Sequence, residues 1–384
     1  MTAPSRPPLA GLRIVELAGI GPGPFAAMML ADMGAEVISV DRPGGNPWAV
    51  AGHGIMFRSR RHLAVDLKAH GGAEVIRRLC ADADGVIETF RPGVAERLGV
   101  GPQDCLARNP DLVYGRMTGW GQSGPMAALP GHDINYIALS GALHAIGRAG
   151  QAPVPPLNLV GDFGGGGMLL AFGMVSGILA ARSGGGGRVV DAAMIDGVSA
   201  LMAMFHSYRA EGAFSEERGT HLLGTGAWFY DTYRTRDDQW VSIGAIEPQF
   251  LAELCDVLQL PDELRDNQFD TALWDDFREV LASRIAAFDR DELDRMFAGR
   301  NTCYAPVLPL SDVVTHPHHV ERGTFVEVDG IPQPAPAPRF HGAPPTSPTA
   351  RRAPGADSRA VLAAAGFSDE EIAELVTEGV VATG

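Results

Sequence analysis

Cysteine and basic residues are both scarce in this chain of 384 residues. Its four cysteines lie far apart, without a C-x-x-C pair, at Cys80, Cys105, Cys255 and Cys303. This spacing favours reduced thiols and argues against a disulfide framework or a cysteine zinc site. The 31 Lys and Arg residues are outnumbered by 46 Asp and Glu residues, which gives a net charge of -15. That balance argues against nucleic-acid binding, although a few local arginines could still hold a small anion.

A long uninterrupted apolar run is also lacking. The most apolar stretch, 168–181, is interrupted by glycines and is too short for a membrane span, so it predicts a buried helix. Residues 1–8 lack the apolar centre of a signal peptide, and 381–384 carry no targeting tag. We therefore expect a cytoplasmic protein whose partners include neither nucleic acid nor membrane.

Strand and helix patterns alternate through the first third of the chain. Short apolar runs typical of buried strands occur at 12–17, 36–41, 85–90 and 112–117. Helical patterns at 25–33 and 73–81 separate them, and a further strand and helix follow Gly187. Because parallel strands need crossover connections, this alternation predicts an α/β fold with a parallel sheet between two layers of helices.

The composition changes near Thr225. A strand pattern at 240–246 is followed by amphipathic helical patterns at 248–258, 273–288 and 291–298. We therefore expect two domains joined by linkers. The large domain comprises 1–200 and 325–384, and the smaller α+β domain comprises 225–320.

The C-terminal region has two distinct patterns. The proline-rich segment 332–354 is expected to be extended. The tail 358–380 has helical periodicity, in which Ser368 and Glu371 have the spacing of a capping box.

The first strand-to-helix turn resembles a dinucleotide-binding fingerprint. LRIVELAGIGPGP carries Gly19, Gly21 and Gly23, and Asp41 follows about 20 residues later. Pro24, however, stands where the third glycine belongs, and proline removes a backbone donor that a pyrophosphate would use. A tight structural turn is the favoured interpretation, and a nicotinamide-dependent oxidoreductase is an alternative. Arg42 could instead hold a phosphate on an adenosine ribose.

Eight segments in order resemble the class III CoA-transferase and racemase family. They are LAGLRIVELAGIGPGPFAAMMLADMGAEVISVDRP, ETFRPGVAERLG, TGWGQSGP, GHDINYIALSG, LVGDFGGGGMLLAFGMVSGILAA, GRVVDAAMIDG, VSIGAIEPQF and APRF. Within the family, GHDINY together with GAIEPQF is similar to the α-methylacyl-CoA racemases. The resemblance implies a Rossmann-like large domain, a smaller domain and an interlocked homodimer.

The resemblance also implies a reaction. The chain would interconvert (2R)- and (2S)-2-methylacyl-CoA by removing and returning the α-proton through an enolate, with no cofactor because CoA is part of the substrate. His132 and Asp162 would be the acid–base groups on opposite faces of the α-carbon. Glu247, from the other subunit, would orient the imidazole, and Asn158 and Asp133 would support the site by hydrogen bonds.

The residues themselves are compatible with these roles. His132 precedes a helical pattern, and a helix N-terminus disfavours imidazolium and keeps the ring a usable base. Asp162 is followed by Phe163 and four glycines, whose amides could stabilise an enolate oxygen. On local pattern alone, a helix-start histidine and an N-cap aspartate are the alternatives.

Two other functions are open for the same residues. A CoA-transferase of this family would use Asp162 as a nucleophile that forms an acyl-enzyme. Transferases carry a glycine-rich loop before the small domain, but HLLGTGAWFYDTYRTRDDQW has only Gly224 and Gly226 there. This difference favours a racemase. A non-catalytic CoA-binding protein is the second alternative.

The resemblance further implies a set of CoA contacts. Guanidinium groups suit phosphates because they donate in a planar fork. The matching positions are Arg42, Val65, Asp66, Leu67, Lys68, Glu88, Phe90, Arg91, Arg97, Gly131 and Tyr136. The run RSRRH at 58–62 could add positive charge at the entrance of the CoA site, although each member by itself is more typical of a charged surface exposed to solvent. His316, His318 and His319 are not expected to hold a metal.

Overall fold

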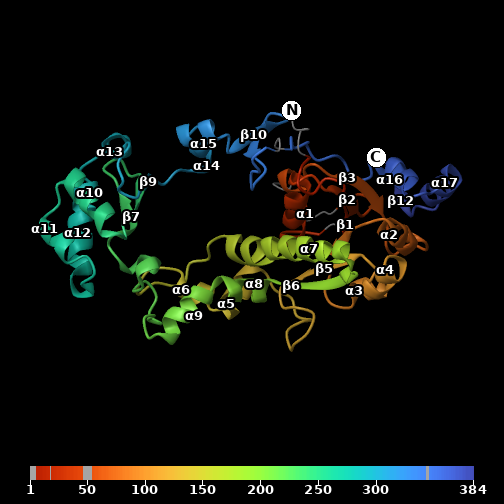
Figure 1. Cartoon of the computed structure of the whole chain (residues 1–384), viewed down its shortest axis with the longest axis horizontal. Helices are drawn as coiled ribbons and strands as arrows, with labels where there is room; N and C mark the ends of the chain where they lie inside the picture. Colours follow the sequence, from red (N-terminus) through yellow and green to blue (C-terminus); the bar gives the residue numbers. More distant parts are fainter. Residues whose placement is uncertain (1–5, 18, 46–53, 343–345) are drawn as a thin grey trace. The chain divides into compact units, whose positions relative to one another are not determined.

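The computed structural model describes residues 6–17, 19–45, 54–342 and 346–384 (Figure 1). Internal contacts divide the chain into two compact units. The large unit comprises Met1–Ser140, Pro156–Met202 and Gly323–Gly384. The small unit comprises Gly141–Pro155 and Ala203–Arg322.

The large unit is built on a seven-stranded sheet with the order β12-β3-β2-β1-β4-β5-β6. The strands β1 to β6 pair in parallel, and β12 runs antiparallel to β3. The strands are β1 (Arg13–Leu17), β2 (Glu36–Asp41), β3 (Arg61–Val65), β4 (Gly85–Glu88), β5 (Val113–Thr118), β6 (Arg188–Ala193) and β12 (Val381–Ala382). The predicted parallel sheet is confirmed, and its order 3-2-1-4-5-6 is that of doubly wound nucleotide-binding folds.

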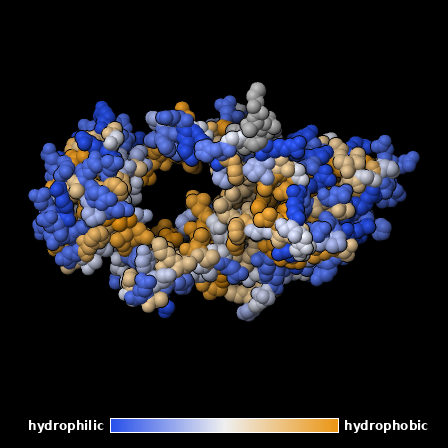
Figure 2. Space-filling view, in the orientation of Figure 1, coloured by the Kyte–Doolittle hydropathy of each residue, from blue (hydrophilic) through white to orange (hydrophobic). Residues whose placement is uncertain are grey.

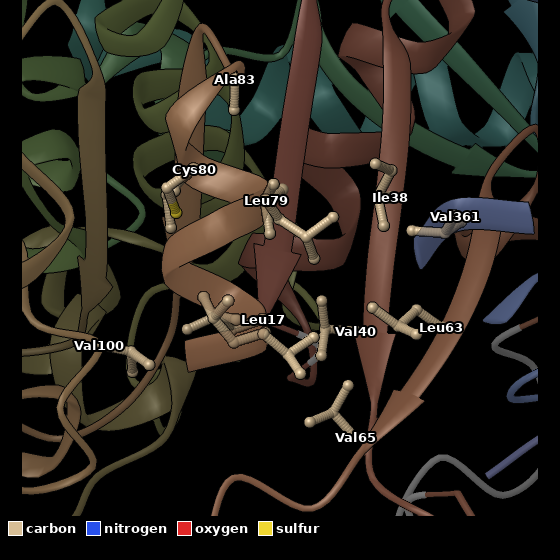
Figure 3. Close-up of a cluster of buried hydrophobic side chains, with 14 of the residues drawn as sticks. Leu17, Ile38, Val40, Leu63, Val65, Leu79, Cys80, Ala83, Val100 and Val361 are labelled. Carbon is tan, nitrogen blue, oxygen red and sulfur yellow. The ribbon is translucent and has the colours of Figure 1, made fainter. Parts of the chain in front are cut away.

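Helices cover both faces of this sheet. One face packs against α2 (Gly72–Ala81), α4 (Pro102–Arg108) and α16 (Ser358–Ala364), and the other against α1 (Pro22–Asp32) and α7 (Leu169–Ala180). Successive residues of a strand point to opposite faces, so Val15 joins the first core and Ile14 the second. Figure 3 shows the first core, where side chains of β2 and β3 meet Leu79 of α2 and Val361 of α16.

Shorter elements complete the large unit. They are η1 (Ile55–Phe57), α3 (Val94–Arg97), α5 (Asp133–Leu139), η2 (Leu159–Met168), η3 (Ala181–Gly185), α8 (Met194–Leu201), β10 (Phe325–Val328), β11 (Ile331–Pro334) and α17 (Asp369–Thr377). The capping box at the start of α17 is confirmed. The Glu371 backbone N–H donates to Ser368 Oγ, and the Ser368 backbone N–H donates to Glu371 Oε2.

The apolar helix is longer and less buried than the sequence predicts. Because π-helical turns extend it at both ends, Leu159–Gly185 forms one helical stretch of 27 residues. By length and composition alone, this stretch of the described chain could cross a membrane. A core helix passes the same test, and here the inner side packs on the sheet through Leu170 and Met174. Phe172, by contrast, is 72% exposed, so the prediction of a buried helix is wrong for its outer side.

Three residues of the basic run at 58–62, Arg58, Arg60 and His62, lie inside the protein. Arg58 pairs with Asp32 of α1, Arg60 pairs with Glu16 of β1, and His62 Nδ1 lies 2.8 Å from Asp41 Oδ2 of β2. All six side chains are buried. The expectation of a solvated face is therefore wrong for these three residues of the run. Arg61 differs from them, because its side chain is 32% exposed and pairs with Glu36.

The small unit contains a three-stranded antiparallel sheet of β7 (Tyr230–Arg234), β8 (Trp240–Gly244) and β9 (Tyr304–Pro306). Its helices are α6 (Ala142–Ala145), α9 (Ala203–Ala210), η4 (Leu222–Gly226), α10 (Pro248–Leu258), α11 (Asp262–Asp266), η5 (Thr271–Leu273), α12 (Trp274–Ile285), α13 (Arg290–Phe297), α14 (Leu310–Val313) and α15 (Pro317–Arg322). Trp228, Leu251 and Leu281 lie in its core. The strand and the three helices predicted after Thr225 are confirmed as β8, α10, α12 and α13.

Candidate active site

A cavity of about 480 Å³ lies in the large unit where the parallel strands end. Its walls include the residues that directly follow β4, β5 and β6, and also Ile20, which lies three residues after β1. The chain leaves β1 and β4, which are neighbours, in opposite directions along the sheet, and open α/β sheets bind ligands at such a switch point. We call this space the acid–base cavity. Predicted site residues in its wall are Phe90, Arg91, Gly131, His132, Tyr136, Asn158 and Asp162.

Asp162 sits on the π-helical turns of η2 and is half-buried. Its Oδ2 accepts a hydrogen bond of 2.9 Å from Asn158 Nδ2, and its backbone N–H donates to Asp133 Oδ1 at 2.7 Å. Burial raises the pKa of Asp162 above its usual range, although the Asn158 hydrogen bond lowers it. A carboxyl with a raised pKa is suited to exchanging a proton with a weak carbon acid.

His132 caps the N-terminus of α5 and is exposed at the cavity wall. Its backbone N–H donates to Asn135 Oδ1 at 3.0 Å, which fixes the start of the helix. A positive charge on His132 lowers the pKa of Asp162, so the two side chains lie within electrostatic reach of each other. Two acid–base groups of different chemistry therefore share one cavity.

Asp133 joins the segments that carry these two groups. It follows His132 directly, is 7% exposed and accepts the N–H of Asp162. A Cβ on Gly161 would lie 2.3 Å from Asp133 Oδ1, so the close approach requires glycine there. Asp133 Oδ2 has no hydrogen-bond partner among the described residues. The supporting role predicted for Asp133 thus has a geometric basis.

The glycines after Asp162 serve packing between helices. A Cβ on Gly165 would lie 2.7 Å from Val198 of α8, and one on Gly167 would lie 2.7 Å from Phe25 of α1. Both glycines are buried. None of the four glycines at 164–167 lines the acid–base cavity, and their role toward an enolate oxygen stays a prediction.

The glycines of the first turn also serve close packing. A Cβ on Gly19 or Gly23 would collide with Thr89, which follows β4. Gly21 has a φ of +67°, and a Cβ there would lie 3.2 Å from Asp162 Oδ2. The turn thus brings the start of α1 beside the Asp162 carboxylate, and packing accounts for its glycines without a dinucleotide.

Tyr136 forms a buried part of the cavity wall. Its ring packs edge-on against Trp120, with 4.7 Å between ring centroids. A Cβ on Gly119 or Gly131 would collide with this ring, so both glycines give it room. Burial raises the pKa of Tyr136, and the Asp162 charge raises it further. The phenol therefore keeps its proton beside Asp162.

A second cavity of about 660 Å³ lies beyond the end of β3. Its wall contains the basic residues Lys68, His70, Arg77 and Arg97. Glu74, an acidic residue in the same wall, pairs with Arg77 and Arg108. We call this space the basic cavity. In a protein with a net charge of -15, such a wall is suited to an anion.

The remaining predicted residues lie in varied surroundings. Leu67 lines the basic cavity, and Asp66 Oδ1 accepts the N–H of Lys68. Val65 and Glu88 are buried, at 1% and 0% exposure. Arg42 is exposed, and its Nε donates to the Gly45 carbonyl.

Glu247 belongs to the small unit, where it is exposed and caps α10. Its side chain makes no cap hydrogen bond. The pairing of Glu247 with His132 stays a prediction.

Residues 9–358 match the sequence model of CoA-transferase family III. The chain belongs to this family. It is 42% identical over 377 residues to alpha-methylacyl-CoA racemase of Mus musculus, covering 97% of each chain. It is 30% identical over 358 residues to succinyl-CoA:glutarate CoA-transferase of Mus musculus, covering 88% of this chain and 81% of the relative. The structure of a CAIB/BAIF family protein from Brucella suis superposes with a TM-score of 0.81 at 26% identity, covering 94% of this chain and 100% of that one.

Sequence reasoning missed several residues of the two cavity walls of this family III chain, among them Trp120 and His70. Trp120 supports Tyr136, and His70 lines the basic cavity. Trp120 stands inside TGWGQSGP, a segment that carries the resemblance, and His70 lies two residues after Lys68. The sequence therefore held a positional signal for both, but their neighbours come from distant segments.

Proposed function

We propose that this chain is an α-methylacyl-CoA racemase, which interconverts (2R)- and (2S)-2-methylacyl-CoA thioesters. The observation that carries the proposal is the meeting of His132 and the half-buried Asp162 in one cavity at the switch point of the sheet. The family membership and the similarity to the mouse racemase support the same activity. Mechanistically, one group removes the α-proton and the other returns a proton to the opposite face.

The surroundings of the pair suit this exchange. The thioester carbonyl delocalises the carbanion into an enolate, so the substrate itself activates the proton and no added cofactor is required. Burial raises the pKa of Asp162, which strengthens this carboxylate as a base toward a weakly acidic C–H group. Asn158 holds the carboxylate, and Asp133 fixes the backbone from which it projects.

The basic cavity supports CoA as the carrier of the acyl group. Lys68 and Arg97 provide positive charge for phosphates. Arg91 lies in the wall of the acid–base cavity, where a phosphate group of the same CoA molecule could reach it. The two cavities thus correspond to the two chemical ends of an acyl-CoA.

We also propose that two copies form the enzyme. Met168, Phe172, Val175 and Leu179 are exposed and recur every three or four residues, so they share one face of the long helix. Figure 2 shows apolar surface where α7 lies in Figure 1. A contiguous exposed apolar face of this kind favours cover by a partner. We also propose a cytoplasmic location, because the spacing of the four cysteines favours reduced thiols.

Co-expression of two inactive variants tests the dimer. If Glu247 of one subunit serves His132 of the other, a heterodimer of His132→Ala and Glu247→Ala retains one intact site. We expect co-expressed, doubly tagged heterodimer to recover measurable activity, up to about half of the wild type. Recovery of none, with a heterodimer present, would place both residues in the same subunit's site. Full activity of Glu247→Ala by itself would remove Glu247 from the site.

One experiment tests the reaction. The protein is incubated with a single enantiomer of a 2-methylacyl-CoA in D₂O, and NMR follows loss of the α-proton while chiral analysis follows the other enantiomer. Exchange with inversion that disappears in His132→Ala and Asp162→Ala supports the racemase. Transfer of CoA to an added free acid, without exchange, would instead make Asp162 the nucleophile of a CoA-transferase.

A further inference from the structure

One loop contributes side chains to both cavities of the large unit. It follows β4, turns at Gly93 with a φ of +79°, and continues into α3. Phe90 and Arg91 near its start line the acid–base cavity, and Arg97 at its end lines the basic cavity. The conformation of this loop therefore sets the spacing between Arg91 and Arg97.

Arg116 of β5 clamps this loop at two points. Its Nε donates to Glu88 Oε1 at 2.8 Å, at the end of β4. Its Nη1 donates to Glu96 Oε1 at 2.7 Å, and its Nη2 to Glu96 Oε2 at 3.3 Å, in α3. One planar guanidinium thus holds carboxylates on either side of the turn. Such a fork fixes geometry better than a single ammonium would.

The inner end of the clamp is fully enclosed. Glu88 is 0% exposed, and its second oxygen accepts the Phe90 N–H at 2.6 Å. Burial raises the pKa of Glu88 to about 6, although the Arg116 charge lowers it. Arg116 itself is 7% exposed. Because buried ion pairs contribute little net stability compared with apolar packing, a geometric role accounts better for these charges.

We infer that Arg116 is a positioning residue for CoA binding, which acts through Glu88 and Glu96 to hold Arg91 and Arg97 in place for the phosphates of CoA. The inference rests on the proposed function and deepens it. Arg116 lies beneath the loop and acts on the ligand only through its neighbours. Its loss would therefore affect binding of the nucleotide end of CoA and leave proton transfer by His132 and Asp162 intact.

Glu96→Ala tests the clamp without exposing the core. The Glu96 side chain is 38% exposed, and Arg116 keeps its pair with Glu88 in this variant. NMR titration of CoA should show a Kd raised about threefold to fivefold, the range expected for a partly exposed ion pair. Pantetheine, which lacks the phosphates, should bind with an unchanged Kd. With acyl-CoA, KM should rise and kcat should stay constant.

Glu36→Ala is the matched control. Glu36 also pairs with two arginines, Arg13 and Arg61, and its side chain is 33% exposed, but it lies on β2 outside both cavity walls. This variant should bind CoA as the wild type does. Glu96→Gln, which keeps one acceptor for Arg116 without its charge, should give an intermediate Kd.

The outcomes separate the inference from the proposed function. Unchanged CoA binding in Glu96→Ala would overturn the clamp and leave the racemase standing. Equal weakening of CoA and pantetheine, or the same loss in Glu36→Ala, would also overturn it, because the effect would then be a general loss of structure. A wild type that binds CoA without exchanging the α-proton would overturn the racemase alone, and a wild type that does not bind CoA would overturn both.

Discussion

The two cavities of the large unit occupy the same edge of one sheet but have opposite chemical character. The acid–base cavity contains a half-buried carboxyl, a histidine and a buried tyrosine among apolar side chains. The basic cavity is larger and is lined by Lys68, Arg77 and Arg97, with His70 beside them. Burial tunes proton affinity in the first, whereas exposed charge provides attraction in the second. The difference predicts that variants of the first change kcat and variants of the second change KM.

The largest expected effect is the loss of Asp162. Asp162→Ala removes one of the two proton carriers, and we expect kcat to fall by about 10²–10⁴-fold, the range of general acid–base catalysis. KM for acyl-CoA should change less than about twofold, because the basic cavity is untouched. Deuterium exchange at the α-carbon measures the rate. A loss of only a few-fold would show that Asp162 is not a proton carrier.

Lys68→Ala should give the opposite pattern. A charged contact to a phosphate contributes about 1.5–3 kcal/mol, so we expect KM to rise at least about tenfold with kcat unchanged. Steady-state kinetics with acyl-CoA measures both constants. The acyl-pantetheine thioester, which lacks the nucleotide, serves as the control substrate, and an equal loss on it would remove Lys68 from phosphate binding.

Asn158→Ala sharpens the role of burial in the acid–base cavity. The Asn158 N–H stabilises the charged form of Asp162 and so lowers its pKa, and its removal raises that pKa further. In the direction in which Asp162 accepts the α-proton, the acidic limb of the pH–rate profile should move to higher pH. On that limb the rate should fall about fivefold, the value of one hydrogen bond. An unmoved limb would contradict the coupling.

Glu74→Gln should give the smallest effect, and with the opposite sign. The change removes a negative charge from the basic cavity and releases Arg77 and Arg108 from their ion pairs. We expect KM for acyl-CoA to fall about twofold, because exposed pairs are weak. kcat should not change. An increase in KM would show that Glu74 holds its arginines in the productive position.

The sheet could be predicted because its strands are short apolar runs, the pattern that burial on both faces imposes. The strands predicted at 36–41 and 12–17 agree with the bounds of β2 and β1 to within one residue. β3 was missed because Arg61 and His62 resemble a solvated segment, and their partners Glu36 and Asp41 lie more than 20 residues away. Pairing across such distances leaves no local pattern.

The site was predictable in its residues but not in its construction. The resemblance named His132 and Asp162, and the structure brings both into one cavity. The link through Asp133 requires Gly161 to allow close approach, which no sequence pattern displays. The glycines at 164–167 have the composition of a ligand loop, yet they pack against α8 and α1. A run of glycines indicates that the backbone is free to be approached closely, but it does not indicate whether a ligand or a neighbouring helix makes that approach.

The returning C-terminal segment has a consequence for how the chain acquires its structure. β12 pairs Val381 with Val65 of β3, after the entire small unit and more than 300 residues of chain. In Figure 1, the C-terminal helices α16 and α17 lie beside β3 and α2. During synthesis, β3 is therefore an unpaired edge strand until the C-terminal segment has been translated. Unpaired edge strands can pair with strands of other chains. We expect truncation before Asp357, whose carboxylate accepts the His62 N–H, to cause aggregation of newly made chains before it affects any chemistry.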